Sequence, residues 1–234
     1  MTIRFILLDI EGTTTDIDFV HQVLFPYSAE RLAQFVRDNM DSCAVQECLD
    51  QVKITVLDEQ QKAINDEAAI ETLLHWIQTD RKHGALKELQ GMIWKTGFEQ
   101  GHYQGHIYPD VPVALERWKQ QGIGLGIYSS GSVQAQKLLF GYSVFGDLTP
   151  YFSHYFDTQV GGKKETQSYR NIADALQISP SEILFLSDVP AELDAAQQAG
   201  FQTTQLLRTS NMQTGSHPTA TDFSNLAPAP ANAV

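Results

Sequence analysis

The chain has little of what marks a secreted or membrane-bound protein. Its 234 residues contain only two cysteines, Cys43 and Cys48, and a spacing of five in a helical-looking stretch places them on different helix faces. This spacing does not suit a metal site or a redox pair, so we expect two reduced thiols. No apolar run approaches the length of a membrane span, and no apolar signal core precedes the first expected strand. These absences favour a cytoplasmic protein with no membrane partner.

Positive charge is also scarce. Lys and Arg number 16 against 28 Asp and Glu, which gives a formal net charge of -12. A protein that binds nucleic acid or an anionic membrane needs a basic face, so this balance speaks against such partners. Hydrophobic residues make up 42% and charged residues 19%, an ordinary globular composition. An anionic substrate would therefore be attracted locally, by a metal and a few cations in a pocket.

Short apolar segments predict a sheet. Residues 3–8 form an apolar-leaning run without a turn former, which predicts a buried strand. Later in the chain expected strands alternate with expected helices. The strands are 123–129, 155–158, 183–187 and 202–207, and the helices are 133–140, 165–176 and 191–199. Such alternation is typical of a parallel sheet with helices on both faces, so the fold class we expect is α/β with a Rossmann-like core.

A helical block separates the first expected strand from the others. From about residue 18 to 105 apolar residues recur at helical spacing, for example at Ile70, Leu73, Leu74 and Ile77. We therefore expect an α/β catalytic core at 1–18 and 106–234, an inserted all-helical cap at 19–105, and a disordered tail at 226–234. An insertion close to the active site can act as a lid that excludes water.

Two acids follow the first expected strand. Asp9 and Glu11 are separated by one residue, and Gly12 lets the chain turn sharply after them. In an open α/β sheet the active site lies at the carboxyl ends of the strands. Asp9 is therefore a candidate nucleophile that could take up a phosphoryl group, and both carboxylates could approach one Mg2+. The alternative is a solvated Asp and Glu that open a loop.

The next two expected strands also end in groups that suit a phosphate. Ser129 and Ser130 precede a helix, where hydroxyls and backbone amides bind phosphate oxygens. A serine that only caps this helix is the alternative. Lys163 and Lys164 follow two glycines that would let a lysine approach bound phosphate. A surface lysine pair is the alternative here, and the spacing alone does not choose between the two lysines.

A third acid, Asp188, follows the fourth expected strand. Mg2+ prefers oxygen ligands and keeps several waters, so two or three carboxylates from neighbouring strand ends suffice. Taken alone, Asp188 would more simply cap the following helix, with Pro190 in its first turn. The coincidence of Asp9, Glu11 and Asp188 at strand ends favours a magnesium site instead.

The order of these groups resembles the haloacid dehalogenase-like hydrolase superfamily, whose motifs are an Asp nucleophile, a Ser or Thr, a Lys and a metal-binding acid. The resemblance covers nearly the whole chain. Longer strings resemble the enolase-phosphatases of methionine salvage, and Glu11 supports this because most phosphatases of the superfamily carry Asp there. These strings are residues 19–20, 24–27, 106–111, 128–140, 156–158 leading to Lys163, and 168–169.

This resemblance implies a Mg2+-dependent enolase-phosphatase, monomeric and with one Mg2+ per chain, that converts 2,3-diketo-5-methylthiopentyl-1-phosphate to an acireductone and phosphate. It selects Lys163 over Lys164, although Gly162 stands where the family would have His. The implied roles are catalysis by Asp9, Glu11 and Lys163, substrate binding by Ser129, Ser130 and Lys163, and metal binding by Asp9, Glu11 and Asp188.

Two other functions stay open at this point. A phosphatase of the same superfamily could act on another small phosphate ester, because fold and core motifs do not fix the substrate. A catalytically inactive binding module could retain the fold, but the intact set of motif residues argues against it. The base that removes the proton in the enolisation is also open, since Glu11 or a residue of the lid could serve.

Overall fold

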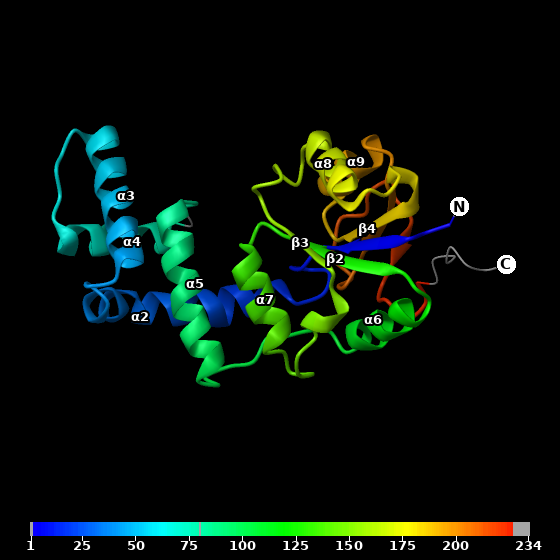
Figure 1. Ribbon diagram of the computed structural model, residues 1–234, viewed down its shortest axis with the longest axis horizontal. Helices are drawn as coiled ribbons and strands as arrows, with labels where there is room; N and C mark the ends of the chain where they lie inside the picture. The colour runs from blue at the N-terminus through cyan, green and yellow to red at the C-terminus, as the bar shows by residue number, and fades with distance from the viewer. Residues whose placement is uncertain (1, 80, 227–234) are drawn as a thin grey trace. The chain divides into compact units, whose positions relative to one another are not determined.

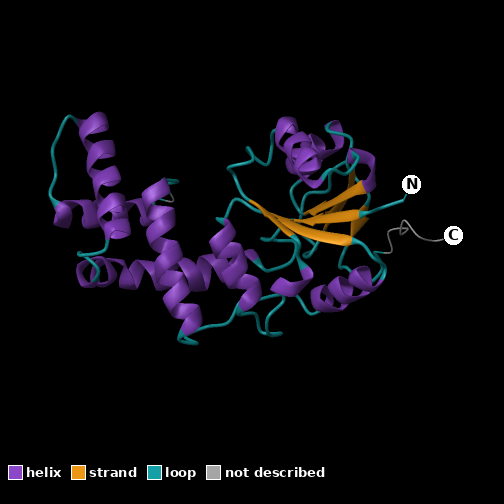
Figure 2. Ribbon diagram, in the orientation of Figure 1, coloured by secondary structure: helices purple, strands orange, loops and turns teal. Residues whose placement is uncertain are grey.

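The computed structural model describes residues 2–79 and 81–226. In this part of the chain, six parallel strands form one sheet in the order β3-β2-β1-β4-β5-β6 (Figure 1, Figure 2). The strands are β1 Phe5–Leu8, β2 Gly124–Tyr128, β3 His154–Phe156, β4 Ile183–Ser187, β5 Gln202–Leu206 and β6 Thr219–Ala220. This is the strand order of a Rossmann-like sheet, so the predicted fold class is confirmed.

The first strand occupies the centre of the sheet. All of β1 is buried, and it pairs with β2 and β4 so that Leu8 lies opposite Ile127 and Leu186. The sheet grows outward from β1 through β2 on one side and through β4 on the other, so the strand order reverses at β1. The residues that follow β1, β2 and β4 are therefore brought to one edge of the sheet.

Helices cover both faces of this sheet. The helices of the core are α6 Asp110–Gln120, α7 Val133–Gly141, α8 Thr166–Leu176 and α9 Pro190–Gln198, with 3-10 turns at Thr149–Tyr151 and Pro180–Glu182. Figure 1 shows α8 and α9 on one side of the strands and α6 and α7 on the other. The face under α8 and α9 is packed by a cluster of large side chains, which includes Phe5, Leu7, Tyr128, Tyr169, Ile172, Phe185 and Leu193.

The segment between β1 and α6 forms a compact unit of its own, Asp18–Tyr103, and the other unit comprises Met1–Ile17 and Gln104–Val234. The inserted segment is all-helical, as expected. Its helices are α1 Ile17–Phe19, a π-helical turn Val20–Leu24, α2 Phe25–Asp38, α3 Cys43–Gln60, α4 Asp66–Gln78 and α5 Gly84–Glu99. The predicted apolar faces build its core, in which Leu32, Val36, Ile70, Leu73, Leu86, Leu89 and Ile93 are buried.

Cys43 is exposed, Cys48 is buried, and both are free thiols. Within the described residues, no helix combines the length and the apolar character needed to cross a membrane. The predicted tail begins at Leu226, whose carbonyl accepts hydrogen bonds from Arg117 and Trp118 of α6. The rest of that tail, 227–234, lies outside the described residues.

Candidate active site

Asp9 lies at the end of β1 and is 2% exposed. Its N–H donates to the Leu186 carbonyl at 2.9 Å, which continues the pairing with β4. This bond fixes the backbone from which the carboxylate projects. One carboxylate oxygen accepts the N–H of Ile10 at 2.7 Å and also contacts the Lys163 ammonium. The other accepts the Ser187 hydroxyl at 3.1 Å. The candidate nucleophile is therefore held in one orientation.

The candidate lysine is Lys163, and the structure distinguishes it from its neighbour. Lys163 is 8% exposed, whereas Lys164 is exposed. The chain reaches Lys163 through a turn at Gly161, whose φ is +130°. A Cβ at this position would collide with the Ser168 hydroxyl, so the turn requires glycine. Tyr169 then donates to the Lys163 carbonyl at 2.6 Å, so the backbone that carries the lysine is fixed by α8.

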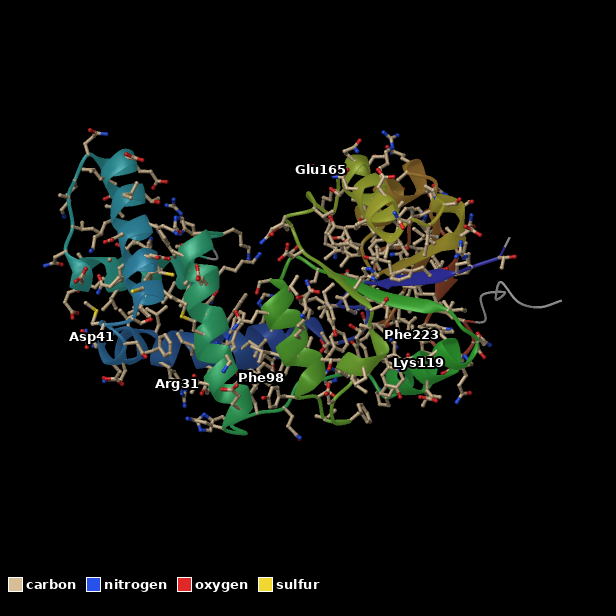
Figure 3. All side chains as sticks on the ribbon, in the orientation of Figure 1. Arg31, Asp41, Phe98, Lys119, Glu165 and Phe223 are labelled. Atoms are coloured by element: carbon tan, nitrogen blue, oxygen red, sulfur yellow. The ribbon has the colours of Figure 1, made fainter. Side chains whose placement is uncertain are left out.

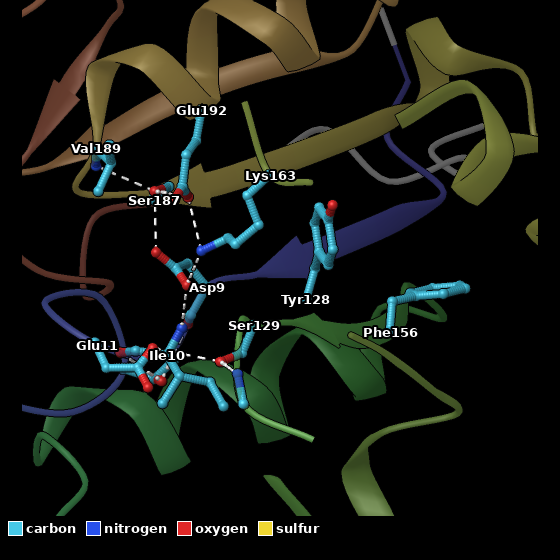
Figure 4. Close-up of polar contacts among 12 residues, drawn as sticks. Asp9, Ile10, Glu11, Tyr128, Ser129, Phe156, Lys163, Ser187, Val189 and Glu192 are labelled. Carbon is cyan, nitrogen blue, oxygen red and sulfur yellow. Dashed lines mark hydrogen bonds and ion pairs between the residues drawn. The ribbon is translucent and has the colours of Figure 1, made fainter. Parts of the chain in front are cut away.

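Glu192 completes the surroundings of Lys163. Its Oε2 lies 2.7 Å from the Lys163 ammonium, and the Ser187 hydroxyl lies 3.1 Å from the same oxygen. Figure 4 shows the ammonium between the carboxylates of Asp9 and Glu192. Sequence reasoning did not single out Glu192, which lies in the first turn of α9.

Ser129 and Glu11 meet across the same edge. The Ser129 hydroxyl donates to the Glu11 carboxylate at 3.4 Å and accepts the N–H of Gly131 at 3.0 Å (Figure 4). The N-cap of α7 is Ser132, whose hydroxyl accepts the N–H of Ala135. The capping function that was open for Ser129 and Ser130 therefore falls to another serine. Ser129 is buried and Ser130 is exposed.

Asp188 lies against the turn that follows Asp9. Gly12 has φ +70°, and a Cβ at this position would come within 2.3 Å of the Asp188 carboxylate. The N-cap of α9 is Val189, with Pro190 at the first helical position, so Asp188 is not the helix cap considered from the sequence. Its Oδ1 is buried and has no hydrogen-bond partner among the described residues.

The acids around Asp9 are buried close to its negative charge, and both conditions disfavour their ionised forms. Burial, and then the charge of Asp9, raise the pKa of Asp188 to about 7 and that of Glu192 to about 7. The same two causes raise the pKa of Glu11. Burial works against the charge of Lys163, but the carboxylates of Asp9 and Glu192 outweigh it and raise the pKa of the lysine. The site carries more negative charge than one lysine neutralises, and a second cation would relieve it.

The donor set suits a metal that keeps part of its own water shell. Within residues 2–79 and 81–226, no group of three or more His, Cys, Asp and Glu side chains is placed to hold a metal ion. Mg2+ does not need one, because it binds through one or two carboxylates, waters and substrate phosphate oxygens. The unpaired Asp188 Oδ1 at the same sheet edge as Asp9 therefore fits an open magnesium site.

The predicted site residues thus come from the segments that follow four strands, β1, β2, β3 and β4. Asp9 contacts Lys163, Glu11 contacts Ser129, and Asp188 lies against Gly12, next to Glu11. A buried carboxylate paired with an ammonium at the end of a central parallel strand is a chemical combination that suits phosphoryl transfer.

Comparison with known proteins defines the class. The haloacid dehalogenase-like hydrolase family matches residues 3–200 of the chain. The crystal structure of the UTR4 protein from Saccharomyces cerevisiae superposes with a TM-score of 0.80 at 36% identity, covering 96% of this chain and all (100%) of that one. The chain is therefore a haloacid dehalogenase-like hydrolase.

Curated relatives refine this assignment. The chain is 53% identical over 231 residues to enolase-phosphatase E1 of Klebsiella oxytoca, and the match covers 97% of each chain. It is 50% identical over 221 residues to enolase-phosphatase E1 of Picosynechococcus sp., covering 94% of this chain and 96% of that one. Within its class, the chain belongs to the enolase-phosphatase E1 family, and the resemblance inferred from the sequence is confirmed.

Proposed function

We propose that the chain converts 2,3-diketo-5-methylthiopentyl-1-phosphate to the acireductone 1,2-dihydroxy-3-keto-5-methylthiopentene and phosphate in methionine salvage. The observation that carries this proposal is the buried pair of Asp9 and Lys163 at the end of β1, in a chain about half identical to enolase-phosphatases over nearly its whole length. The substrate must be enolised before its phosphate is removed, so the site has two steps to perform.

Enolisation removes a proton next to a carbonyl and creates an oxyanion. We assign the base to Glu11, because its carboxylate follows Asp9 at the same edge of the sheet and contacts Ser129, and because burial and the Asp9 charge raise its pKa, which strengthens it as a proton acceptor. Ser129 donates to this carboxylate and orients it. Returning the proton to the oxyanion gives the enol phosphate.

Phosphoryl transfer follows at Asp9. The Asp9 carboxylate attacks phosphorus in line, the bond from phosphorus to the substrate oxygen breaks, and an aspartyl phosphate forms. Lys163, Ser129 and Ser130 hold the phosphoryl oxygens during this step. Attack of water on the aspartyl phosphate releases phosphate and restores the free carboxylate.

The same edge of the sheet would hold one Mg2+ through the side chains of Asp9 and Asp188 and through Glu11, whose backbone carbonyl could bind the ion and leave its carboxylate to move the proton. The fit rests on the buried, unpaired Asp188 Oδ1 and on the excess of acids around one lysine. When bound, the ion neutralises charge on phosphoryl oxygens and stabilises a developing enolate.

The remaining parts of the proposal concern the surroundings of the site. Residues 19–105 would act as a cap over the catalytic core, which comprises residues 1–18 and 106–234. The chain would work as a monomer in the cytoplasm, on a small phosphorylated diketone, without a nucleic-acid or membrane partner. The formal net charge of -12 supports the last point.

The test is a comparison of substrates. Phosphate release from the diketo phosphate, with Mg2+, is measured beside a panel of simple phosphate esters. We expect a kcat/KM for the diketo phosphate at least about 100-fold above that of any other ester, since binding of the remote methylthio part contributes to the transition state. If another ester is cleaved faster, the chain is a phosphatase with a different substrate. If no ester is cleaved, the inactive binding module is favoured.

A further inference from the structure

Arg208 is a buried cation that the mechanism above does not use. It lies two residues after β5, and its side chain is 6% exposed. One guanidinium nitrogen, Nη1, contacts both carboxylate oxygens of Asp110, at 2.9 and 2.8 Å. Its remaining donors, Nε and Nη2, both bond the backbone carbonyl of Thr13, at 2.9 and 2.7 Å. Only a planar fork of N–H groups can hold both partners at once.

Aromatic rings fix the guanidinium further. Its carbon lies 4.3 Å from the centre of the Tyr108 ring and 4.9 Å from that of Phe223, distances at which a cation is attracted to the ring face. Phe223, labelled in Figure 3, packs against Trp118 of α6 and donates its N–H to Asp110 at 2.7 Å. The position of Arg208 is therefore determined by contacts from several segments of the core.

What Arg208 holds is the turn that follows the nucleophile. The carbonyl of Ile10 accepts the N–H groups of residues 13, 14 and 15, so this turn is a single hydrogen-bonded unit. Tyr108 donates its N–H to the Thr14 carbonyl at 3.0 Å and adds a second anchor. Gly12, inside the turn, lies directly against the Asp188 carboxylate. A displacement of Thr13 would therefore move Glu11 and Gly12 relative to Asp9 and Asp188.

We propose that Arg208 is a positioning residue for the reaction, which sets the turn 10–15 through the carbonyl of Thr13 and is itself held by Asp110. It touches no reacting atom. The inference rests on the proposed function for the roles of Glu11 and Asp188, but the site that it positions does not depend on which phosphate ester is cleaved.

The test compares Arg208→Lys and Arg208→Met with Arg37→Met. Arg37 pairs through Nε and Nη2 with the two carboxylate oxygens of Glu67 on the surface of the helical unit, at 3.1 and 2.7 Å, so its variant controls for loss of an arginine ion pair as such. For each protein, kcat and KM for phosphate release are measured together with the melting temperature. Any phosphate ester that the unaltered protein hydrolyses serves as substrate.

We expect kcat to fall by about 10- to 100-fold in both Arg208 variants with KM changed less than about threefold, the size of effect produced by a small displacement of catalytic groups. Arg208→Lys keeps a positive charge beside Asp110 and a melting temperature close to the original, but a single ammonium does not reproduce the fork to Thr13. Its lowered kcat separates positioning from stability. Arg37→Met should keep its kcat.

Two results would overturn the inference. A kcat within about twofold of the original in Arg208→Lys would show that the fork to Thr13 has no catalytic consequence. A loss of rate that follows the melting temperature in both Arg208 variants would assign the cluster to stability alone. Failure of the proposed substrate, in contrast, would be seen in the unaltered protein, so the two failures are distinguishable.

Discussion

At the scale of single residues, the site depends on one buried lysine between two acids. The partner of Lys163 changes during the reaction, from the Asp9 carboxylate to phosphoryl oxygens, whereas Glu192, 2.7 Å from the ammonium, takes no part in bond making and holds the lysine throughout. Replacing Glu192→Gln keeps the shape but removes this charge, so we expect the kcat of phosphate release to fall about tenfold or more, because the lysine is no longer held in place.

The matched control for this variant is Glu116→Gln in α6, an exposed glutamate that accepts hydrogen bonds from Gln120 and Tyr151. Steady-state rates of the two variants and of the original protein give the comparison. Equal rates in all three would contradict the assigned importance of Glu192.

The sequence could predict Asp9 and Lys163 at this scale, but not how they meet. Acids and glycines at strand ends mark a site because a parallel sheet brings those ends together. The choice of Lys163 over Lys164 by geometry needs the turn at Gly161, whose φ of +130° is set by tertiary contacts. Glu192 and Arg208 also escaped prediction, because each acquires its partner only in the folded chain.

At the scale of elements, one helix of the inserted unit begins at a histidine. His83 is the N-cap of α5, and its Nδ1 accepts the N–H of Ala85 at 3.2 Å. Its Nε2 lies 3.0 Å from the Thr55 hydroxyl, which itself donates to the Gln51 carbonyl. The ring is therefore a neutral imidazole with its proton on Nε2. Burial, and then the charge of Arg81, lower the pKa of His83 below 6.5.

This pKa gives a pH dependence with a definite sign. A group whose pKa is lower in the folded than in the unfolded state contributes stability above its unfolded pKa, here 6.5, and loses that contribution as the pH falls toward its folded value. Protonation at Nδ1 would also remove the acceptor that caps α5. In His83→Asn the amide oxygen remains an acceptor at every pH.

We therefore expect the stability of the original protein to fall more steeply than that of His83→Asn below pH 6.5, by up to about 1 kcal/mol, the size of one helix cap. Thermal unfolding followed at a series of pH values measures this difference. Parallel curves for the two proteins would contradict it.

Element prediction succeeded for the strands around the site and missed two other elements of the core. The strands around the site were predicted to within one or two residues, because each is an apolar run bounded by turn formers. The helix α6 was missed at the change in pattern after Pro109, although Val111, Ala114, Leu115 and Trp118 share its buried face. The strand β6 has only two residues, Thr219 and Ala220, too few for any period to be visible.

At the scale of the whole molecule, the sheet assembles a phosphoryl-transfer site from widely separated parts of the chain. The parallel register places the ends of β1, β2 and β4 at one edge, so that Asp9, Ser129 and Ser187 are neighbours. The helical unit enters the chain directly after the turn that follows Asp9. Asp9 is central to this account, because the nucleophilic attack on phosphorus is assigned to its carboxylate alone.

The most direct measurement follows acireductone absorbance and phosphate release in parallel from the diketo phosphate, comparing the original protein with Asp9→Asn. The account predicts both signals from the original protein. In Asp9→Asn it predicts that phosphate release falls by at least about 1,000-fold, because an amide cannot form the acyl phosphate. If Glu11 acts as the base, the same variant still enolises the substrate, and enol phosphate accumulates. Phosphate release by Asp9→Asn at a rate close to the original would contradict the assignment of Asp9 as nucleophile.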